Sequence, residues 1–128
     1  MKVIEGEYIT YYVLPYGKKG NIKYNKEYEP YWEKIKEELQ PDIVHIHGTE
    51  FSHGLAYIKA CGNAGVVVSI QGMKSGIAPH YCAGLSYKEI YENLTFHDII
   101  KGTIYKEQCS FYKSGELEKD LLRNVNHI

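Results

Sequence analysis

Polar side chains gather at the ends of two short apolar segments of the chain. The first segment ends in the stretch HIHGTE at 45–50, and the second ends in SIQGMKSG at 69–76. Histidine, glutamine, glutamate and lysine can hydrogen-bond a hydroxyl group or attract an anion, and glycine lets a ligand approach the backbone closely. The candidate ligand-binding residues are therefore His47, Gly48, Thr49, Glu50, Gln71, Gly72 and Lys74.

Some of these residues also have an ordinary structural explanation. His45 and His47 are two positions apart and share one face of a strand. His45 lies inside the strand, which is typical of a hydrogen-bonded core histidine, whereas His47 lies at its end and fits packing and binding equally well. Glu50 is most often a solvated or helix-capping acid.

Neither a metal nor a cofactor is predicted at these loops. The H-x-H pair at 45–47 needs a third metal ligand, and His53, His80 and Glu50 offer none at a recognisable spacing. The glycines of 72–76 do not form G-x-G-x-x-G, and they follow the second strand rather than opening a nucleotide-binding unit. We therefore expect no bound metal and no dinucleotide.

A strand, a helix and a second strand must position the candidate residues. Residues 42–47 are predicted to form a strand, and 53–61 a helix with capping hydroxyls between Thr49 and Ser52. The run 66–70, in which four of the five residues are β-branched, is typical of a strand buried on both faces. Such a unit pairs its strands in parallel, so both polar loops lie at one edge of the sheet. The predicted fold is α/β, with a Rossmann-like parallel sheet flanked by helices.

Turn residues and periodicity predict the elements before this unit. A hairpin is expected over 2–14 and a surface loop over 16–27. A helix is expected from Pro30, stopped by Pro41. Its apolar face holds Tyr28, Trp32, Ile35 and Leu39.

The elements after the unit are predicted in the same way. Residues 71–85 are loop-like, and short helices follow Ser86, with a capping box, and Thr95. A helical pattern over 103–124 has a weak point at Ser114-Gly115. Residues 125–128 resemble the beginning of a strand.

Composition excludes several classes of protein. With 44% hydrophobic and 24% charged residues, the 128-residue chain is not intrinsically disordered, and we expect a single domain over 1–128. It has no apolar run of about 18 residues, so we expect no transmembrane segment. A net charge of −1 with Arg123 as the single arginine argues against a nucleic-acid partner. Three cysteines without a C-x-x-C pair, and no signal peptide, indicate the cytoplasm.

Two blocks of the sequence resemble a known enzyme family. Trp32 followed by QPDIVHIHG at 40–48 resembles a segment of family 4 glycosyltransferases of the GT-B fold. The stretches GTEF at 48–51 and VSIQG at 68–72 resemble a bacterial branch of that family. The resemblance covers about residues 30 to 128.

The resemblance implies a function and a place in a larger enzyme. Family members have two Rossmann-like domains, of which the N-terminal one binds the acceptor and the C-terminal one grips a nucleotide-activated sugar. The loops at 45–50 and 71–76 would face the cleft between them, with Gln71 where many members carry a histidine. The glycine-rich loop would lie before Met1 and the donor-binding domain beyond Ile128, so the chain is expected to be a truncated N-terminal domain, inactive alone.

The implied partners are a nucleotide-sugar donor, bound through the absent domain, and a sugar or lipid-linked sugar acceptor. The expected location is the cytoplasm, where the enzyme could also lie peripherally at the inner face of the membrane. Two alternatives stay open. One is a non-catalytic α/β ligand-binding domain, and the other is a metal-dependent hydrolase that uses His45, His47 and Glu50.

Overall fold

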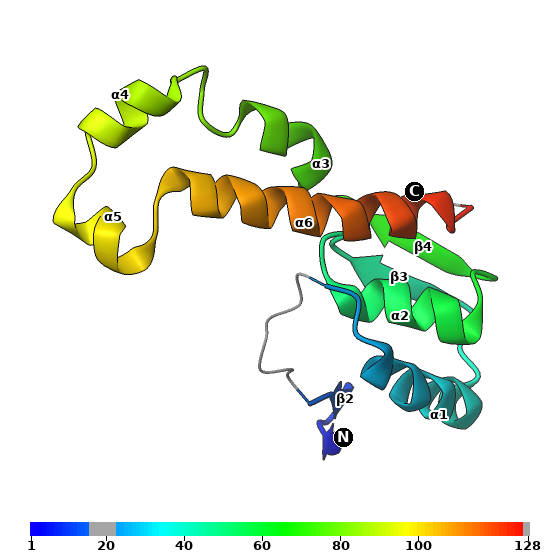
Figure 1. Cartoon of the computed structure of the whole chain (residues 1–128). Coiled ribbons are helices and arrows are strands. Elements are labelled where there is room, and N and C mark those ends of the chain that lie inside the picture. Colours follow the sequence, from blue (N-terminus) through cyan, green and yellow to red (C-terminus); the bar gives the residue numbers. More distant parts are fainter. Residues whose placement is uncertain (16–22, 127–128) are drawn as a thin grey trace.

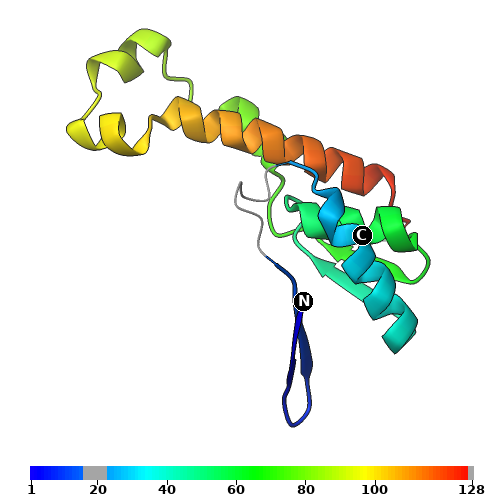
Figure 2. The ribbon, with the colours of Figure 1, turned by 60° about the horizontal axis from the view of Figure 1, so that its bottom comes forward.

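The protein is a mixed α/β chain built around a small parallel sheet (Figure 1). A computed structural model describes residues 1–15 and 23–126. Helices α2 and α6 pack against the sheet, α1 packs against α2, and an arm of short helices extends from the sheet along the N-terminal half of α6. A separate hairpin projects from the other end of the molecule (Figure 2).

The predicted strand–helix–strand unit is confirmed. Strand β3 (Val44–His47) leads into helix α2 (Ser52–Cys61), and strand β4 (Val66–Ser69) returns parallel to β3. One face of the strand pair packs on α2 and α6 and forms the core, whose members are Ile46, Leu55, Tyr57, Ile58, Val66, Val68, Leu117 and Leu121. Helix α2 comes very close to β3 at Gly54, where a Cβ would lie 2.7 Å from Ile46 Cγ2.

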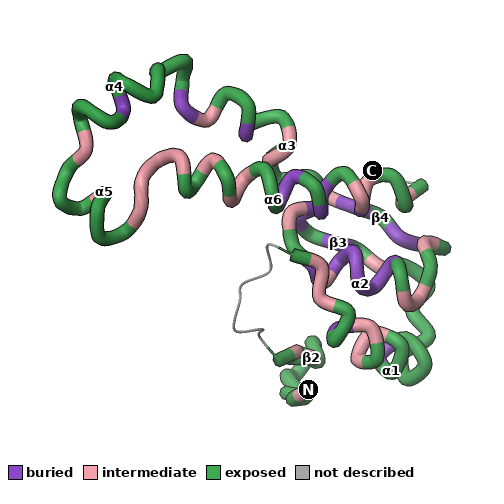
Figure 3. Tube along the Cα trace, viewed as in Figure 1, coloured by how far each residue is buried: buried purple, intermediate pink, exposed green. Residues whose placement is uncertain are grey.

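The opposite face of this sheet is open in the part of the chain that the structure describes. Val67 is 39% exposed while Val66 and Val68 are buried, so burial alternates along β4. The buried parts of the chain gather where the sheet, α2 and α6 meet (Figure 3). The prediction that this strand is buried on both faces is therefore wrong. A β-branched run favours a strand, but it cannot say how many of the strand's faces are covered.

The helix expected from Pro30 is helix α1 (Glu29–Leu39), and it follows a short 3₁₀ turn, η1 (Lys26–Tyr28). Proline stands in its first turn, and Gln40 ends it in a left-handed conformation with φ of 44°. Tyr28 and Ile35 are buried as the apolar face predicts. Leu39 is not, since it lies 51% exposed at the last position of the helix.

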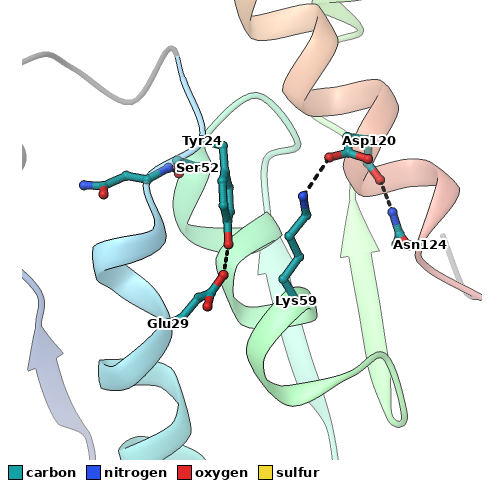
Figure 4. A network of polar contacts seen from close by, with 7 residues as sticks. Tyr24, Glu29, Ser52, Lys59, Asp120 and Asn124 are labelled. Atoms are coloured by element: carbon teal, nitrogen blue, oxygen red, sulfur yellow. Dashed lines mark hydrogen bonds and ion pairs between the residues drawn. The ribbon is translucent and has the colours of Figure 1, made fainter.

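Polar contacts tie α1, α2 and α6 together (Figure 4). The Tyr24 hydroxyl donates to Glu29, and the Lys59 ammonium lies 4.4 Å from the centre of the Tyr24 ring. Lys59 also pairs with Asp120 of α6 at 3.2 Å. These groups are partly exposed, so the network orients the helices more than it stabilises them.

The arm begins inside the segment that was predicted to be loop-like. Residues 71–85 contain helix α3 (Lys74–Ile77) and a 3₁₀ turn, η2 (Ala78–His80), both packed against α6. Hydrophobic periodicity gives no signal over so few residues, so the sequence does not predict α3. The short helices α4 (Tyr87–Glu92) and α5 (Phe96–Lys101) are confirmed, each with a capping box.

Helix α6 (Ile104–Arg123) runs without a break through the predicted weak point. Ser114 and Gly115 are buried there. A Cβ on Gly115 would lie 2.9 Å from Ser75 Cα, so glycine permits close contact with α3 rather than ending the helix.

The N-terminal hairpin is confirmed as strands β1 (Lys2–Glu5) and β2 (Thr10–Val13), paired antiparallel. Of the loop predicted over 16–27, residues 16–22 lie outside the described ones, and 26–27 belong to η1. Of the strand predicted at 125–128, residues 127–128 lie outside them, and Val125 and Asn126 are not in a strand. Within the described ranges, no helix has the length and apolar character to cross a membrane.

Candidate functional site

The two polar loops lie side by side at the carboxyl edge of the sheet, as predicted. The register aligns His47 with Ser69, and the Gly48 amide donates to the Ser69 carbonyl at 3.0 Å. Gly48 has φ of +82°, a conformation that side-chain-bearing residues rarely adopt, so glycine is needed to turn the chain here. The loop after β3 therefore begins in direct contact with the end of β4.

Histidines and their partners line the open face of the sheet. Gln71 Nε2 lies 3.4 Å from His47 Nδ1, and His45 Nε2 lies 2.6 Å from Ser69 Oγ. The two imidazole rings are 4.3 Å apart between centroids. His47 and Gln71 are both exposed, so a ligand can reach either side chain.

His45 is also exposed, which differs from the core histidine that its place inside the strand suggested. The reason is the open sheet face, because alternation directs both histidines to the side that no described helix covers. His45 is nevertheless hydrogen-bonded, through Ser69.

Glu50 and Lys74 form a second, half-buried pair. Lys74 Nζ lies 4.0 Å from Glu50 Oε1, and the two side chains are 26% and 14% exposed. The ammonium also lies 5.6 Å and 5.1 Å from the ring centres of Phe51 and Phe111. Glu50 Oε2 is buried and has no hydrogen-bond partner among the described residues. A buried carboxylate oxygen without a partner costs free energy, so a ligand that donates a hydrogen bond to it would be stabilised.

His53 stands next to this pair on the first turn of α2. Its ring stacks on Phe51, with 5.7 Å between centroids. Burial lowers the pKa of His53, and the neighbouring Glu50 carboxylate partly opposes that shift. His53 is therefore favoured as a neutral imidazole, which can accept a hydrogen bond.

Thr49 faces inward, away from any ligand at the edge. It is fully buried, and its hydroxyl donates to Glu118 Oε2 at 3.1 Å. The helix cap expected from Thr49 to Ser52 does not form either, because Phe51 precedes α2 without a side-chain cap bond. Ser52 instead accepts a hydrogen bond from the Asn25 amide at 2.6 Å.

Glu118 is the site residue that the sequence did not reveal. It comes from α6, is 0% exposed, and accepts hydrogen bonds from the backbone amides of Lys74 at 3.0 Å and Ser75 at 3.1 Å. The Ser75 hydroxyl also donates to it. In the sequence it lies within the run GELEKD, which is typical of a solvated helix face, so no local signal marks it.

Gly72 completes the predicted set. It is exposed, and a Cβ built on it would meet nothing within 4 Å. The space beside Gln71 is therefore open to a ligand. Of the seven predicted residues, the structure pairs His47 with Gln71 and Glu50 with Lys74, and it turns Thr49 into the interior.

A separate apolar cavity of about 460 Å³ lies on the arm, between α4 and the beginning of α6. Its walls include Tyr87 and Tyr105, whose stacked rings are 4.5 Å apart between centroids. It holds none of the predicted site residues, so it is not part of the site at the sheet edge.

The described residues contain no group of three histidine, cysteine or acidic side chains that could hold a metal ion. Comparison with protein-family models, curated proteins and solved structures gives no match to this chain. The glycosyltransferase resemblance therefore stays a prediction from the sequence.

Proposed function

We propose that this chain is the acceptor-side part of a glycosyltransferase, which moves a sugar from a nucleotide-activated donor to an acceptor hydroxyl. The observation that carries the proposal is the meeting of His47 and Gln71 at the carboxyl edge of a parallel strand pair. Ligands of open parallel sheets bind at this edge. The sequence resemblance to family 4 glycosyltransferases covers the same residues, and it suggests a Rossmann-like domain of the GT-B fold.

The side chains at the edge suit the binding of a sugar hydroxyl. Gln71 can donate and accept hydrogen bonds, and His47 offers a ring nitrogen 3.4 Å from it. Holding a hydroxyl in line with a reacting carbon is a task of positioning, which needs no titrating base. Glu50 and Lys74, in the loops that follow the same two strands, form a second polar pair.

Stabilising the diphosphate leaving group needs positive charge or helix N-termini. Among the described residues of this edge the cation is Lys74, and it already faces Glu50 at 4.0 Å. The proposal therefore assigns donor binding to a second domain, as the resemblance implies.

Cys61, Cys82 and Cys109 are free thiols, which supports a reducing compartment such as the cytoplasm.

The test compares the protein encoded by the complete reading frame with the 128-residue chain. Both are incubated with uridine, guanosine and adenosine diphosphate sugars and simple saccharide acceptors, and release of nucleoside diphosphate is measured. We expect turnover by the complete protein and none by the chain alone. Turnover by the 128-residue chain would contradict the assignment of donor binding to a second domain. A complete protein that uses no donor would contradict the glycosyltransferase function.

Side-chain variants of the complete protein locate the site. His47→Ala and Gln71→Ala should each lower transfer about tenfold, the effect of losing one well-placed hydrogen bond. Both residues are exposed, so the melting temperature should hardly change. Val68→Ala is the matched control, because Val68 is 2% exposed and its loss should lower stability without lowering turnover per folded molecule. Early melting with normal specific activity in the His47 and Gln71 variants would make these residues structural.

A non-catalytic ligand-binding domain is the second candidate. It is favoured by the absence of an unpaired cation at the described edge, since binding a saccharide needs no leaving-group stabilisation. Saccharide binding seen by ligand-observed NMR, with no donor turnover by the complete protein, would select it. The hydrolase alternative has no observation in its favour, because the described residues offer no set of three metal ligands.

A further inference from the structure

Three segments distant in the sequence meet at the Glu118 carboxylate. Oε2 accepts from the Thr49 hydroxyl, in the loop after β3, and from the Lys74 amide, at the beginning of α3. Oε1 accepts from the amide and the hydroxyl of Ser75. Glu118 is fully buried, so these donors replace the water that a carboxylate otherwise needs.

This arrangement fixes the distance between the two loops of the candidate site. The residue after Thr49 is Glu50, and the Lys74 amide that Glu118 holds belongs to the residue whose ammonium faces Glu50 at 4.0 Å. We infer that Glu118 is the positioning residue of this site, which sets Lys74 opposite Glu50 by holding the Thr49 side chain and the Lys74 backbone amide on α6. The part of this inference that concerns sugar transfer rests on the proposed function.

The hydrogen bonds that the Glu118 carboxylate accepts make Glu118→Gln an informative substitution. All four partners donate to the carboxylate, whereas an amide group has one oxygen that accepts and one nitrogen that donates. The hydroxyls of Thr49 and Ser75 can rotate to accept a hydrogen bond, but a backbone amide cannot. Whichever way glutamine is oriented, the amide of Lys74 or of Ser75 therefore loses its acceptor.

The first readout is amide hydrogen exchange in the 128-residue chain, taken as the protection of Lys74 and Ser75 relative to the amides of β4. Glu118→Gln should lower this ratio about tenfold or more, because a buried amide without its acceptor opens more readily. Leu117→Ala is the matched control on the same helix, since Leu117 belongs to the core and its apolar side chain cannot accept a hydrogen bond from an amide. It should reduce protection without lowering the ratio.

Two variants at position 49 separate the hydroxyl from the backbone contacts. Thr49→Val removes one donor and should lower the ratio by less than Glu118→Gln does. Thr49→Ser keeps the hydroxyl and should restore the wild-type ratio. If Glu118→Gln leaves the ratio unchanged while overall protection falls, Glu118 supports the fold alone and the inference is wrong.

The second readout is the transfer rate of the complete protein. If Glu118 acts through Lys74, the double variant Glu118→Gln, Lys74→Ala should be no less active than the less active of the two single variants. Losses that multiply would overturn this coupling. Should the complete protein turn over no donor, the proposed function fails, and the exchange ratio still decides whether Glu118 holds the loops.

Discussion

Replacing Gly115 by alanine tests whether close packing of α3 on α6 shapes the candidate site. A Cβ at this position would lie 2.9 Å from Ser75 Cα, closer than Cβ atoms approach other atoms in proteins, and 3.0 Å from the Ser75 nitrogen. The obstacle is backbone, which cannot rotate away as a flexible side chain can. Helix α3 must therefore move away from α6 to admit the methyl group.

The expected magnitude follows from three opposing effects. Alanine in a helix interior gains about 1 kcal/mol over glycine. Overpacking a well-filled contact costs about 1–3 kcal/mol. Displacing Ser75 also strains its bonds to the buried Glu118 carboxylate, and a hydrogen bond to a charged group contributes about 1.5–3 kcal/mol. We expect Gly115→Ala to lower the free energy of unfolding by about 2 kcal/mol.

Gly76→Ala is the matched control, because Gly76 lies in α3 and its nearest contact would be Met73 Cβ at 3.8 Å, an ordinary distance. This change should raise the free energy of unfolding by about 0.5 kcal/mol, through the reduced freedom of the unfolded chain. Urea unfolding followed by circular dichroism measures both variants under one set of conditions. A Gly115→Ala chain as stable as the wild type would refute the argument that backbone contact requires glycine.

Three further outcomes are expected. Folding lowers the pKa of His53 from its ordinary 6.5, so the contribution of His53 to stability is full above that pH and is lost as the pH falls through the lowered value. His53→Gln should therefore weaken the dependence of the melting temperature on pH between about pH 7.5 and pH 5. Ser86→Ala and Thr95→Ala should each remove a capping box and cost about 1 kcal/mol locally, seen as faster amide exchange in α4 and α5 alone. The dialysed chain should hold no stoichiometric zinc or manganese by elemental analysis, since no three described ligands converge.

Much of the fold could be predicted because its elements carry local signals. The run 66–70 is rich in β-branched residues, Pro30 stands in the first turn of α1, and Ser86 stands three residues before Glu89 in the capping box of α4. Each of these signals depends on neighbours within one turn or one strand. Helix α3 has only four residues and no such signal, so the sequence predicts a loop there.

Burial was harder to predict, because it depends on what lies across the sheet. The same β-branched pattern fits a strand covered on one face or on two, and only the fold shows that Val67 and His45 point to the open side. Leu39 follows the helical period of its neighbours, but it is exposed at the last position of α1. Periodicity finds a face of a helix and cannot say where that face stops being packed.

The two pairs at the sheet edge differ in what brings them together, and this decides how far a sequence motif can predict a site. His47 and Gln71 meet because parallel strands in register end at the same edge, so the strand pattern alone suffices to place them. Glu50 and Lys74 lie in loops whose separation no strand fixes. Their contact depends on Glu118, which lies 43 and 44 positions from the amides that it holds and belongs to a helix outside both motifs. A motif therefore predicts those site residues that regular pairing positions, and the residues that a distant buried carboxylate positions become visible only in the folded chain.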